Sequence, residues 1–446
     1  MTTTDHIPRR ATSNILISVW VLLFAFSPLH AQPLTSGDER RETAGASTDP
    51  APAQGDAAPV RIQFSGFGTL GFVYTDAKDV RFVRPSINHH SRDNPDVGPD
   101  TVIGVQGNLS LGQRAAIVVQ AISRKNTRNS YEPHPTLAFI SYAITPNLTV
   151  RAGRLRMPFS MLADTLDINY ANPWIRPSPE IYSMFPFYDL DGADILINNS
   201  FGEWSTELRA FFGKSSADIY RGGKSHLRQS KEPNITITVT NGKLTLFAAH
   251  GSARLSVKWG DEYFQELSDG LHYYDLVTGG STGKNILQDF SGEKGRGRIS
   301  SVAVQWDHMR WLLIAQYALM TATRYCPNAY AWDVTAGRRF GSFMPYLTYA
   351  KHMADDKYTS VTGRGTGFPP VDEGIRAFTA SRTIAQSRVT LGLRWDFYRN
   401  TAFKAEFSHT RIHNNSWGSF FPTDLQNPRM GSRRVNTIGA SIDVTF

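Results

Sequence analysis

The sequence predicts an all-β protein, an antiparallel transmembrane β-barrel of about sixteen strands. Three observations support this prediction. Apolar and polar residues alternate along many segments of strand length, which is the pattern of a β-strand with two unlike faces. These segments come in pairs joined by tight turns, and long polar connections separate one pair from the next. A segment typical of an export signal stands at the N-terminus.

The bulk composition is compatible with this architecture. The chain has 446 residues, of which 41% are hydrophobic, and its mean hydropathy is −0.31. Outside the N-terminus no run of roughly 18 or more apolar residues occurs, which excludes a membrane protein built from helices. A barrel needs only alternate residues to face lipid. The net charge is +8, but the basic residues are scattered among acidic ones and do not form a cluster. Nucleic-acid binding is therefore not expected.

The N-terminal segment predicts export. Residues 1–31 contain Arg9 and Arg10, then the apolar stretch ILISVWVLLFAF, then SPLHA. This order predicts a signal peptide cleaved after Ala31, with an uncleaved anchor helix as the alternative. Residues 32–60 are rich in Ala, Pro, Gly and charge, which predicts a disordered linker. The single cysteine, Cys326, excludes an internal disulfide and a thiolate metal cluster.

Residues 61–446 are expected to form the barrel, with almost no helix. The segment RIQFSGFGTLGFVYT opens it, and seven hairpins and a closing strand follow. An even number of strands, with tight turns at one end and long loops at the other, is typical of bacterial outer-membrane barrels. A soluble sandwich would also alternate, but Trp and Tyr near the strand ends favour a membrane barrel. The turns are predicted near Gln113–Arg114, Pro146–Asn147, Gly202–Glu203, Asn241–Gly242, His308–Met309, Gly337–Arg338 and Arg399–Asn400.

The last strand, within RRVNTIGASIDVTF, alternates strictly and ends on Phe446. In a closed barrel the last strand must pair with the first, because an open edge is not tolerated in lipid. We therefore expect this segment to close the ring. Its aromatic last residue, Phe446, with apolar residues at alternate positions before it, also resembles the C-terminal assembly signal of outer-membrane proteins.

Three stretches resemble the Gram-negative outer-membrane porins, including relatives of the phosphate-selective porins. These are FSGFGTLGF, GRLRMPFSMLADTLDINYANPWIRPSPEIY and the terminal Phe446. The resemblance implies a homotrimer of sixteen-stranded barrels in which the third loop folds inward and narrows the pore. It also implies that the barrel-assembly machinery reads the C-terminal segment. The acidic PEFGG hallmark of the general porins is absent, so their constriction chemistry is not carried over.

Residues 156–189 are the expected constriction loop. They contain several prolines, which stiffen a chain, and they mix aromatic with charged residues. The alternative is an extracellular loop packed on its neighbours. A pore selects ions by the charges at its narrowest part, and the expected set is mainly basic, which predicts a weak anion preference. Alternatively, these charges pair across the lumen and brace the wall. The expected pore-lining residues are Arg154, Arg156, Asp164, Asp167, Arg176, Glu180, Arg209, Arg388, Arg394 and Lys404.

Other motifs give weaker signals. The stretch GGSTG matches the G-x-S-x-G pattern of a nucleophile, but it lies in a Gly/Ser/Thr-rich loop, and we assign it no catalytic role. Asp189, Asp191 and Asp194 could offer oxygen ligands to Ca²⁺ or form a turn into the next strand; we predict no metal site. The stretch GEKGRGR could meet lipopolysaccharide phosphates or be a solvated loop.

These observations predict a passive channel in the bacterial outer membrane for small hydrophilic solutes. No catalysis and no cofactor are expected, and the expected partners are outer-membrane lipid, lipopolysaccharide and the assembly machinery. The alternatives are a substrate-specific barrel or an adhesin. A barrel lipase or protease is less favoured, because the sequence offers no convincing acid–base or nucleophile constellation.

Overall fold

The computed structural model describes residues 60–446 except 85–88, 91–92, 127–128, 185–186, 220–222, 230–233, 292–294, 324–327, 355–365 and 424–430. The predicted signal peptide (1–31), nearly all of the predicted linker (32–60) and Cys326 lie outside the described residues.

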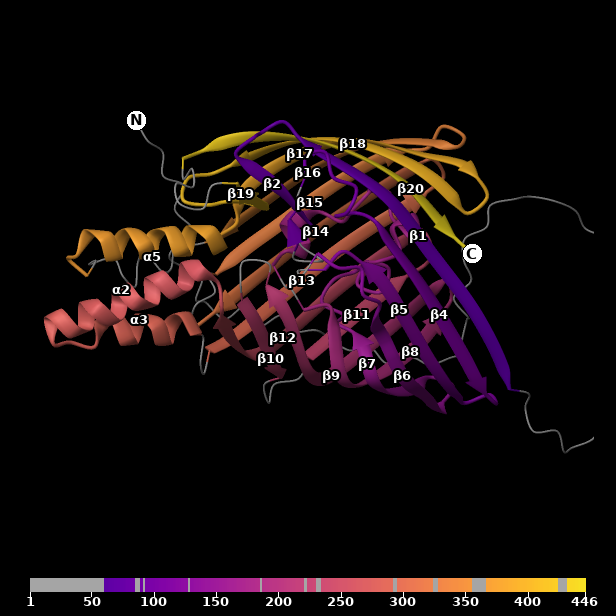
Figure 1. Ribbon diagram of the computed structural model, residues 1–446. Helices are drawn as coiled ribbons and strands as arrows, with labels where there is room; N and C mark the ends of the chain where they lie inside the picture. The colour runs from indigo at the N-terminus through magenta and orange to yellow at the C-terminus, as the bar shows by residue number, and fades with distance from the viewer. Residues whose placement is uncertain are drawn as a thin grey trace, which may run out of the picture.

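The strands form one closed antiparallel barrel with sixteen positions around the ring (Figure 1). β1 (Arg61–Thr75) pairs with β20 (Arg433–Thr445) on one side and with β4 (Val102–Leu111) on the other, which closes it. The ring continues through β5 (Ala115–Arg124), β6 (His134–Thr145), β7 (Leu148–Arg156), β8 (Asp189–Phe201), β9 (Trp204–Ile219), β11 (Asn234–Thr240), β12 (Leu244–Trp259), β13 (Gly295–His308), β14 (Trp311–Ala322), β15 (Ala329–Arg338), β16 (Phe343–Ala354), β17 (Ala385–Tyr398) and β18 (Thr401–Ile412).

The seven predicted hairpins are all present. The sixth turn lies after β15, around Gly341, and not at Gly337–Arg338 as the sequence predicted. Gly341 has φ +60°, a backbone conformation that glycine adopts without a steric penalty. Position eight of the ring is shared by β11 and the short β10 (Gly223–Gln229), and both pair with β9 and β12.

The outer face of the barrel is apolar. On β17 the side chains of Val389, Leu391, Leu393, Trp395 and Phe397 are 36–60% exposed, whereas their neighbours on the other face are mainly buried. Because a closed barrel satisfies its own backbone hydrogen bonds, an apolar outside suits it to lipid. The protein is therefore a transmembrane barrel, and its architecture is that of the bacterial outer membrane.

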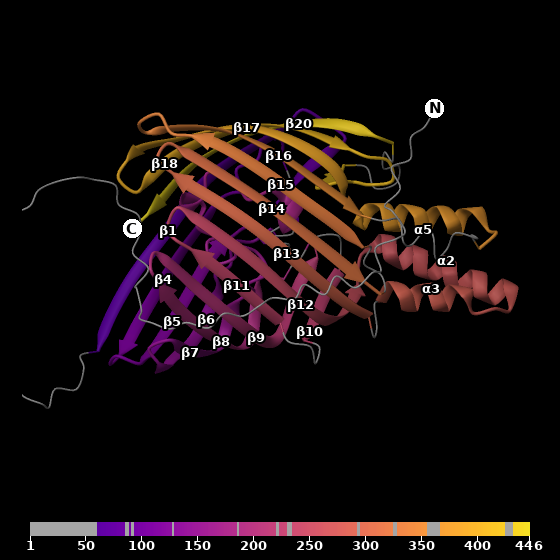
Figure 2. The same ribbon diagram turned by 180° about the vertical axis from the view of Figure 1, so that it is seen from behind.

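The expectation of almost no helix was wrong. α2 (Glu262–Thr278) and α3 (Thr282–Ser291) follow β12, and α5 (Pro369–Arg382) precedes β17. Asp261 caps α2 by accepting a hydrogen bond from the Phe264 backbone N–H, and α5 begins with a proline, both common helix starts. The three helices lie side by side and project from one end of the barrel (Figures 1 and 2). None of the described helices is both long and apolar enough to cross a membrane.

The helices are held together by a small apolar core of their own. Its buried members include Leu271 of α2, Phe290 of α3 and Phe378 of α5. The Phe378 ring lies 4.7 Å from the Phe290 ring and 5.4 Å from the Trp259 ring at the end of β12. Apolar side chains from two long loops thus pack around one aromatic residue. A sequence scan for strands passes over these residues, because polar residues separate them.

Two further loops, the one between β1 and β4 and the one between β18 and β20, meet beside the strands that close the barrel. β2 (Val80–Arg84) pairs with β3 (His89–His90) and with β19 (Phe420–Pro422) in a three-stranded sheet. Phe82 and Phe420 from this sheet pack against Val73, Ile412 and Val435 of the barrel wall.

Phe446 takes part in the closure. Its backbone N–H donates to the Gly66 carbonyl at 3.0 Å, and its carbonyl accepts from the Gly66 N–H at 2.8 Å. The Phe446 ring lies over Gly66, where an added Cβ would fall 2.3 Å from the ring. Phe446 therefore extends the β1–β20 pairing by one residue, while its role as an assembly signal stays a prediction.

Phe378→Ala should loosen the helical unit without opening the barrel. Truncating a buried phenylalanine costs about 3–5 kcal/mol, and here the loss falls on contacts among α2, α3 and α5. Limited proteolysis should cut residues 262–291 faster, while the barrel keeps its folded mobility on a cold detergent gel. Arg376→Ala, an exposed position on the same helix, is the control. Unchanged proteolysis of Phe378→Ala would contradict the shared core.

Candidate functional site

The chain between β7 and β8 runs inside the barrel. Residues 157–188, described except 185–186, are here called the inner loop. The loop contains a short 3₁₀ helix, η2 (Asn169–Ala171), and one helical turn, α1 (Pro179–Tyr182). Its contacts go to inward-facing side chains. Ser301 of β13 donates to the Phe159 carbonyl at 2.6 Å, and the Trp174 indole donates to Thr335 of β15 and Thr348 of β16.

The wall is shaped to receive the loop. The Phe159 ring lies against Gly251 of β12, where an added Cβ would be 2.6 Å from it. Ile175 and Arg176 lie at Gly439 of β20, where the same Cβ would be 3.1 Å from each. These glycines leave the space that the loop side chains occupy, so the loop has a defined seat on both sides of the ring.

Three arginines and three aspartates pair where the chain enters and leaves the loop. Arg151, Arg154 and Arg156 on β7 stand in direct register with Asp194, Asp191 and Asp189 on β8, and each pair forms a salt bridge. Asp194 also accepts from Arg209 of β9 at 2.6 Å. The carboxylates considered for Ca²⁺ are thus matched by guanidinium groups. Among the described residues, no cluster of His, Cys, Asp and Glu could hold a metal ion.

Arg154 does not face the interior. Asp191, its partner, alternates along β8 with the buried Leu190 and Asp194 and shares the outer face with Ile195 and Ile197. The pair is also the most exposed of the three, at 35% and 43% of the side-chain surface. The structure thus places Arg154 on the outer face, unlike the other arginines expected to line the pore. The strict alternation of β7 puts Arg151 and Arg154 on opposite faces.

Asp167 joins the loop to two strands. It is buried and forms ion pairs with Arg124 of β5 and with Arg156 of β7. Burial alone would raise the pKa of Asp167, but the two guanidinium groups hold it well below its usual range. The carboxylate is therefore ionised throughout the physiological pH range.

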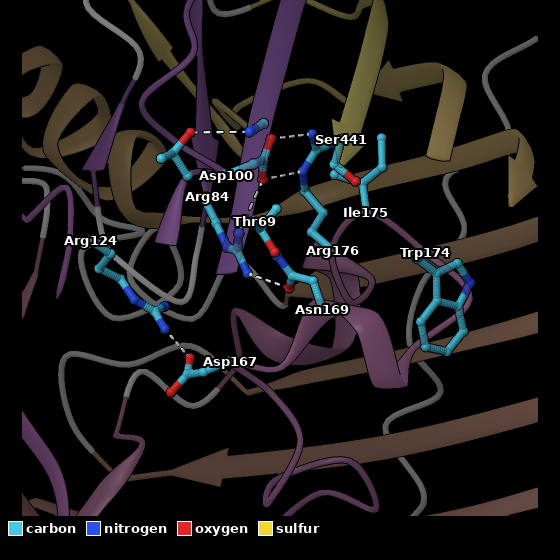
Figure 3. A network of polar contacts seen from close by, with 12 residues as sticks. Thr69, Arg84, Asp100, Arg124, Asp167, Asn169, Trp174, Ile175, Arg176 and Ser441 are labelled. Atoms are coloured by element: carbon cyan, nitrogen blue, oxygen red, sulfur yellow. Dashed lines mark hydrogen bonds and ion pairs between the residues drawn. The ribbon is translucent and has the colours of Figure 1, made fainter. Parts of the chain in front are cut away.

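Arg176 belongs to a second network, shown in Figure 3. Its Nε donates to Asp100 at 2.8 Å, and its guanidinium stacks 4.6 Å from the Phe82 ring centre. Arg84 donates to Asp100 and to the Asn169 side chain, which in turn donates to Thr69 of β1. Burial would raise the pKa of Asp100, but Arg176 and then Arg84 lower it. Two long loops and the wall are thus tied through one carboxylate.

Lys404 is completely buried under the loop. Its ammonium lies 2.9 Å from Asp443 of β20, and it donates to the backbone carbonyls of Asn169 and Trp174 at 2.6 and 2.8 Å. These three acceptors use the three donors of an ammonium group. Lys404 therefore holds the loop backbone directly, and Asp443 supplies the counter-charge.

Glu180 and Arg394 make the remaining anchors. Glu180, fully buried, accepts from Gln386 and Arg388 of β17, and the His352 ring lies 2.8 Å from its carbonyl. Arg394 donates to Asp396 and to the carbonyls of the loop residues Tyr170 and Asn172.

Asp164 differs from the other charged loop residues, because it is exposed. It lies close enough to Arg151, Arg209 and Glu207 to interact with them electrostatically. No salt bridge is found for Asp164 or Glu207 within the described part of the chain.

The sequence listed most of these residues but missed their partners. Arg156, Asp167, Arg176, Glu180, Arg209, Arg388 and Lys404 are buried and ion-paired, and Arg394 is paired and half-buried. The structure therefore matches the alternative in which the charges brace the wall. Partners that sequence analysis did not select are Arg84, Asp100, Arg124 and Asp443.

No protein-family model matches the sequence, and no curated protein matches it either. Similarity appears at the level of structure. The anion-selective porin from Comamonas acidovorans has a TM-score of 0.50 at 9% identity, covering 87% of this chain and 100% of that one. The outer-membrane channel DcaP of Acinetobacter baumannii has 0.50 at 11% identity, covering 87% and 97%. Salmonella typhi OmpF in complex with daunomycin has 0.47 at 11% identity, covering 86% and 97%. The two structures with a TM-score of 0.50 show that the chain has a porin-like fold.

Asp443→Asn should destabilise the barrel strongly, because it leaves the Lys404 ammonium buried without a counter-charge. Breaking a buried ion pair in this way costs about 3–5 kcal/mol. Urea unfolding in lipid vesicles would measure the loss. Asp396→Asn removes the carboxylate of a half-exposed pair and is the control. Equal midpoints for Asp443→Asn and Asp396→Asn would contradict this role of Lys404.

Proposed function

We propose that the protein is an outer-membrane channel for small hydrophilic solutes, narrowed by the inner loop. The observation that carries this proposal is the seat of the loop. The barrel is closed, and residues 157–188 are anchored by buried charges to β5, β17 and β18 and by a buried hydrogen bond to β1. A loop fixed on several sides of a lumen sets the width available to solutes. The short turns would face the periplasm and the long loops the cell exterior.

The charged groups inside the barrel support a channel and not an enzyme. They form ion pairs that hold backbone and wall in place, as Lys404 and Glu180 do. The GGSTG stretch lies at the junction of α2 and α3, where its Ser281 is exposed. We therefore propose no catalytic role and no cofactor.

We propose that the channel has a weak preference for cations over anions. The expectation of anion preference rested on basic residues that the structure pairs with carboxylates. Where the chain enters the inner loop, Arg151 and Arg209 lie near three carboxylates, those of Asp194, Asp164 and Glu207. The exposed charge nearest the loop is therefore negative, and a negative lining favours cations.

Planar-bilayer recording of the refolded protein tests the channel directly. We expect discrete conductance steps and, under a KCl gradient, a reversal potential displaced toward that of K⁺. Folded, inserted protein without conductance would overturn the channel proposal. Conductance with a reversal potential displaced toward that of Cl⁻ would overturn only the ion preference.

Asp164→Asn should shift the permeability ratio of K⁺ to Cl⁻ toward chloride by about two-fold, the size expected for one screened charge near the path. Glu203→Gln removes one exposed charge in the β8–β9 turn and serves as the matched control. A ratio that moves equally in both variants would show that Asp164 does not lie at the selective part of the path.

We also propose that the channel is a homotrimer and that β4, β5 and β6 contribute the subunit contact. The described outward-facing residues of these strands include no Lys, Arg or Trp. They expose Ile103, Val105, Val119, Ile140 and Tyr142. By contrast, β13, β14 and β17 carry outward Trp306, Trp311 and Trp395 at the turn end, the position of an interfacial girdle. The arc without outward-facing Trp is the part that we propose to face protein and not lipid.

Val105→Arg should convert trimers to monomers, because it places a charge in the proposed contact. Val389→Arg makes the same change on β17, where the side chain is similarly exposed, and should leave the trimer intact. Light scattering in mild detergent gives the mass of each. A trimer that survives Val105→Arg would place the contact elsewhere, and a monomeric wild type would refute the trimer itself.

A further inference from the structure

The outer face of β16, β17, β18 and β20 changes from charged to apolar along the strands. Lys351, Ser387, Arg411 and Arg434 stand in one row across the four strands, because each is the direct register partner of the next. Arg411 and Arg434 are exposed, and Lys351 and Ser387 are half-buried. We call these four residues the cationic row.

The rows nearer the tight turns become steadily more apolar. The next outward row holds Tyr349, Val389, His409 and Asn436. The row after it holds Leu347, Leu391, Phe407 and Ile438, which are 52%, 60%, 48% and 48% exposed. The cationic row thus stands directly above the apolar band, at the level where lipid headgroups begin.

The row concentrates positive charge, and within the described part of the chain no salt bridge neutralises it. Arg411 and Arg434 are directly opposite each other, an arrangement of like charges that destabilises a sheet. Neighbouring strands are about 4.8 Å apart, so the two guanidinium groups can reach one anion together. The positive charge of the row also acts on His413, just beyond β18. Burial lowers the pKa of His413, and the charges of Arg411 and Lys351 lower it further. A carboxylate close to the row, that of Asp76, accepts hydrogen bonds from the backbone N–H and the side-chain amide of Asn436.

From this geometry we propose that the cationic row binds the phosphate groups of a membrane lipid whose acyl chains lie along the apolar rows beneath it. Arginine binds phosphate oxygens through two parallel N–H donors, and Ser387 adds a hydroxyl between Lys351 and Arg411. The apolar rows distinguish a lipid from a free anion, since they offer contact to hydrocarbon directly below the charges. The site is separate from the inner loop and does not depend on the channel proposal.

Native mass spectrometry of the folded protein in mild detergent tests this inference. The probes are lipid A with two phosphates, the same lipid without phosphates, and inorganic phosphate. We expect the wild type to retain phosphorylated lipid A, and Arg411→Gln/Arg434→Gln to bind it at least about tenfold more weakly, since each basic residue near an anionic surface contributes a several-fold effect. Lys351→Gln should give an intermediate loss.

The matched control is Lys243→Gln/Arg399→Gln, which removes the same charge from exposed positions in the tight turns. It should bind lipid A as the wild type does. Heat-modifiable gel mobility establishes that each variant is folded. Equal affinity of the row variant and the control would overturn the proposal. Binding of the dephosphorylated lipid as tight as that of lipid A would overturn the role of phosphate, and displacement of the lipid by millimolar inorganic phosphate would overturn the lipid assignment.

Discussion

The structure depends on one constraint, that charges inside the closed barrel must be neutralised where they stand. Taking an ion out of water costs several kcal/mol unless an opposite charge and hydrogen bonds replace the solvent. Lys404 meets this requirement with Asp443 and two loop carbonyls, and Asp167 meets it with two arginines. Because some of the partners lie on the loop and the others on the wall, neutralising these charges also positions the loop.

Much of the barrel could be predicted from the sequence, because the signals of strands and turns in a membrane barrel lie within short segments of the chain. Alternation and tight turns each depend on a few consecutive residues, and the hairpins followed from them. One site feature was also present in the sequence and was not recognised. The spacing of Arg151, Arg154 and Arg156 mirrors that of Asp194, Asp191 and Asp189, as antiparallel pairing requires. Reading the two stretches against each other would have given the three ion pairs.

Other features could not be predicted, because they depend on contacts between distant segments. Asp100 and Asp443 look ordinary in sequence, and only the fold brings them to Arg176 and Lys404. The helical unit needs Phe378, Phe290 and Trp259 from separate parts of the chain. The argument for an anion preference was incomplete for a similar reason, since counting basic residues ignores which of them are paired with carboxylates.

The anchoring of the loop also sets an order of events during assembly. Residues 157–188 precede β15–β18 and β20 in the chain, yet their seat includes Thr335, Arg388, Lys404 and Gly439 from those strands. The loop therefore cannot take its final position until the C-terminal strands are in place. An unfinished barrel would have a wider, less obstructed interior than the finished one, and the passage would reach its final width only as the ring closes.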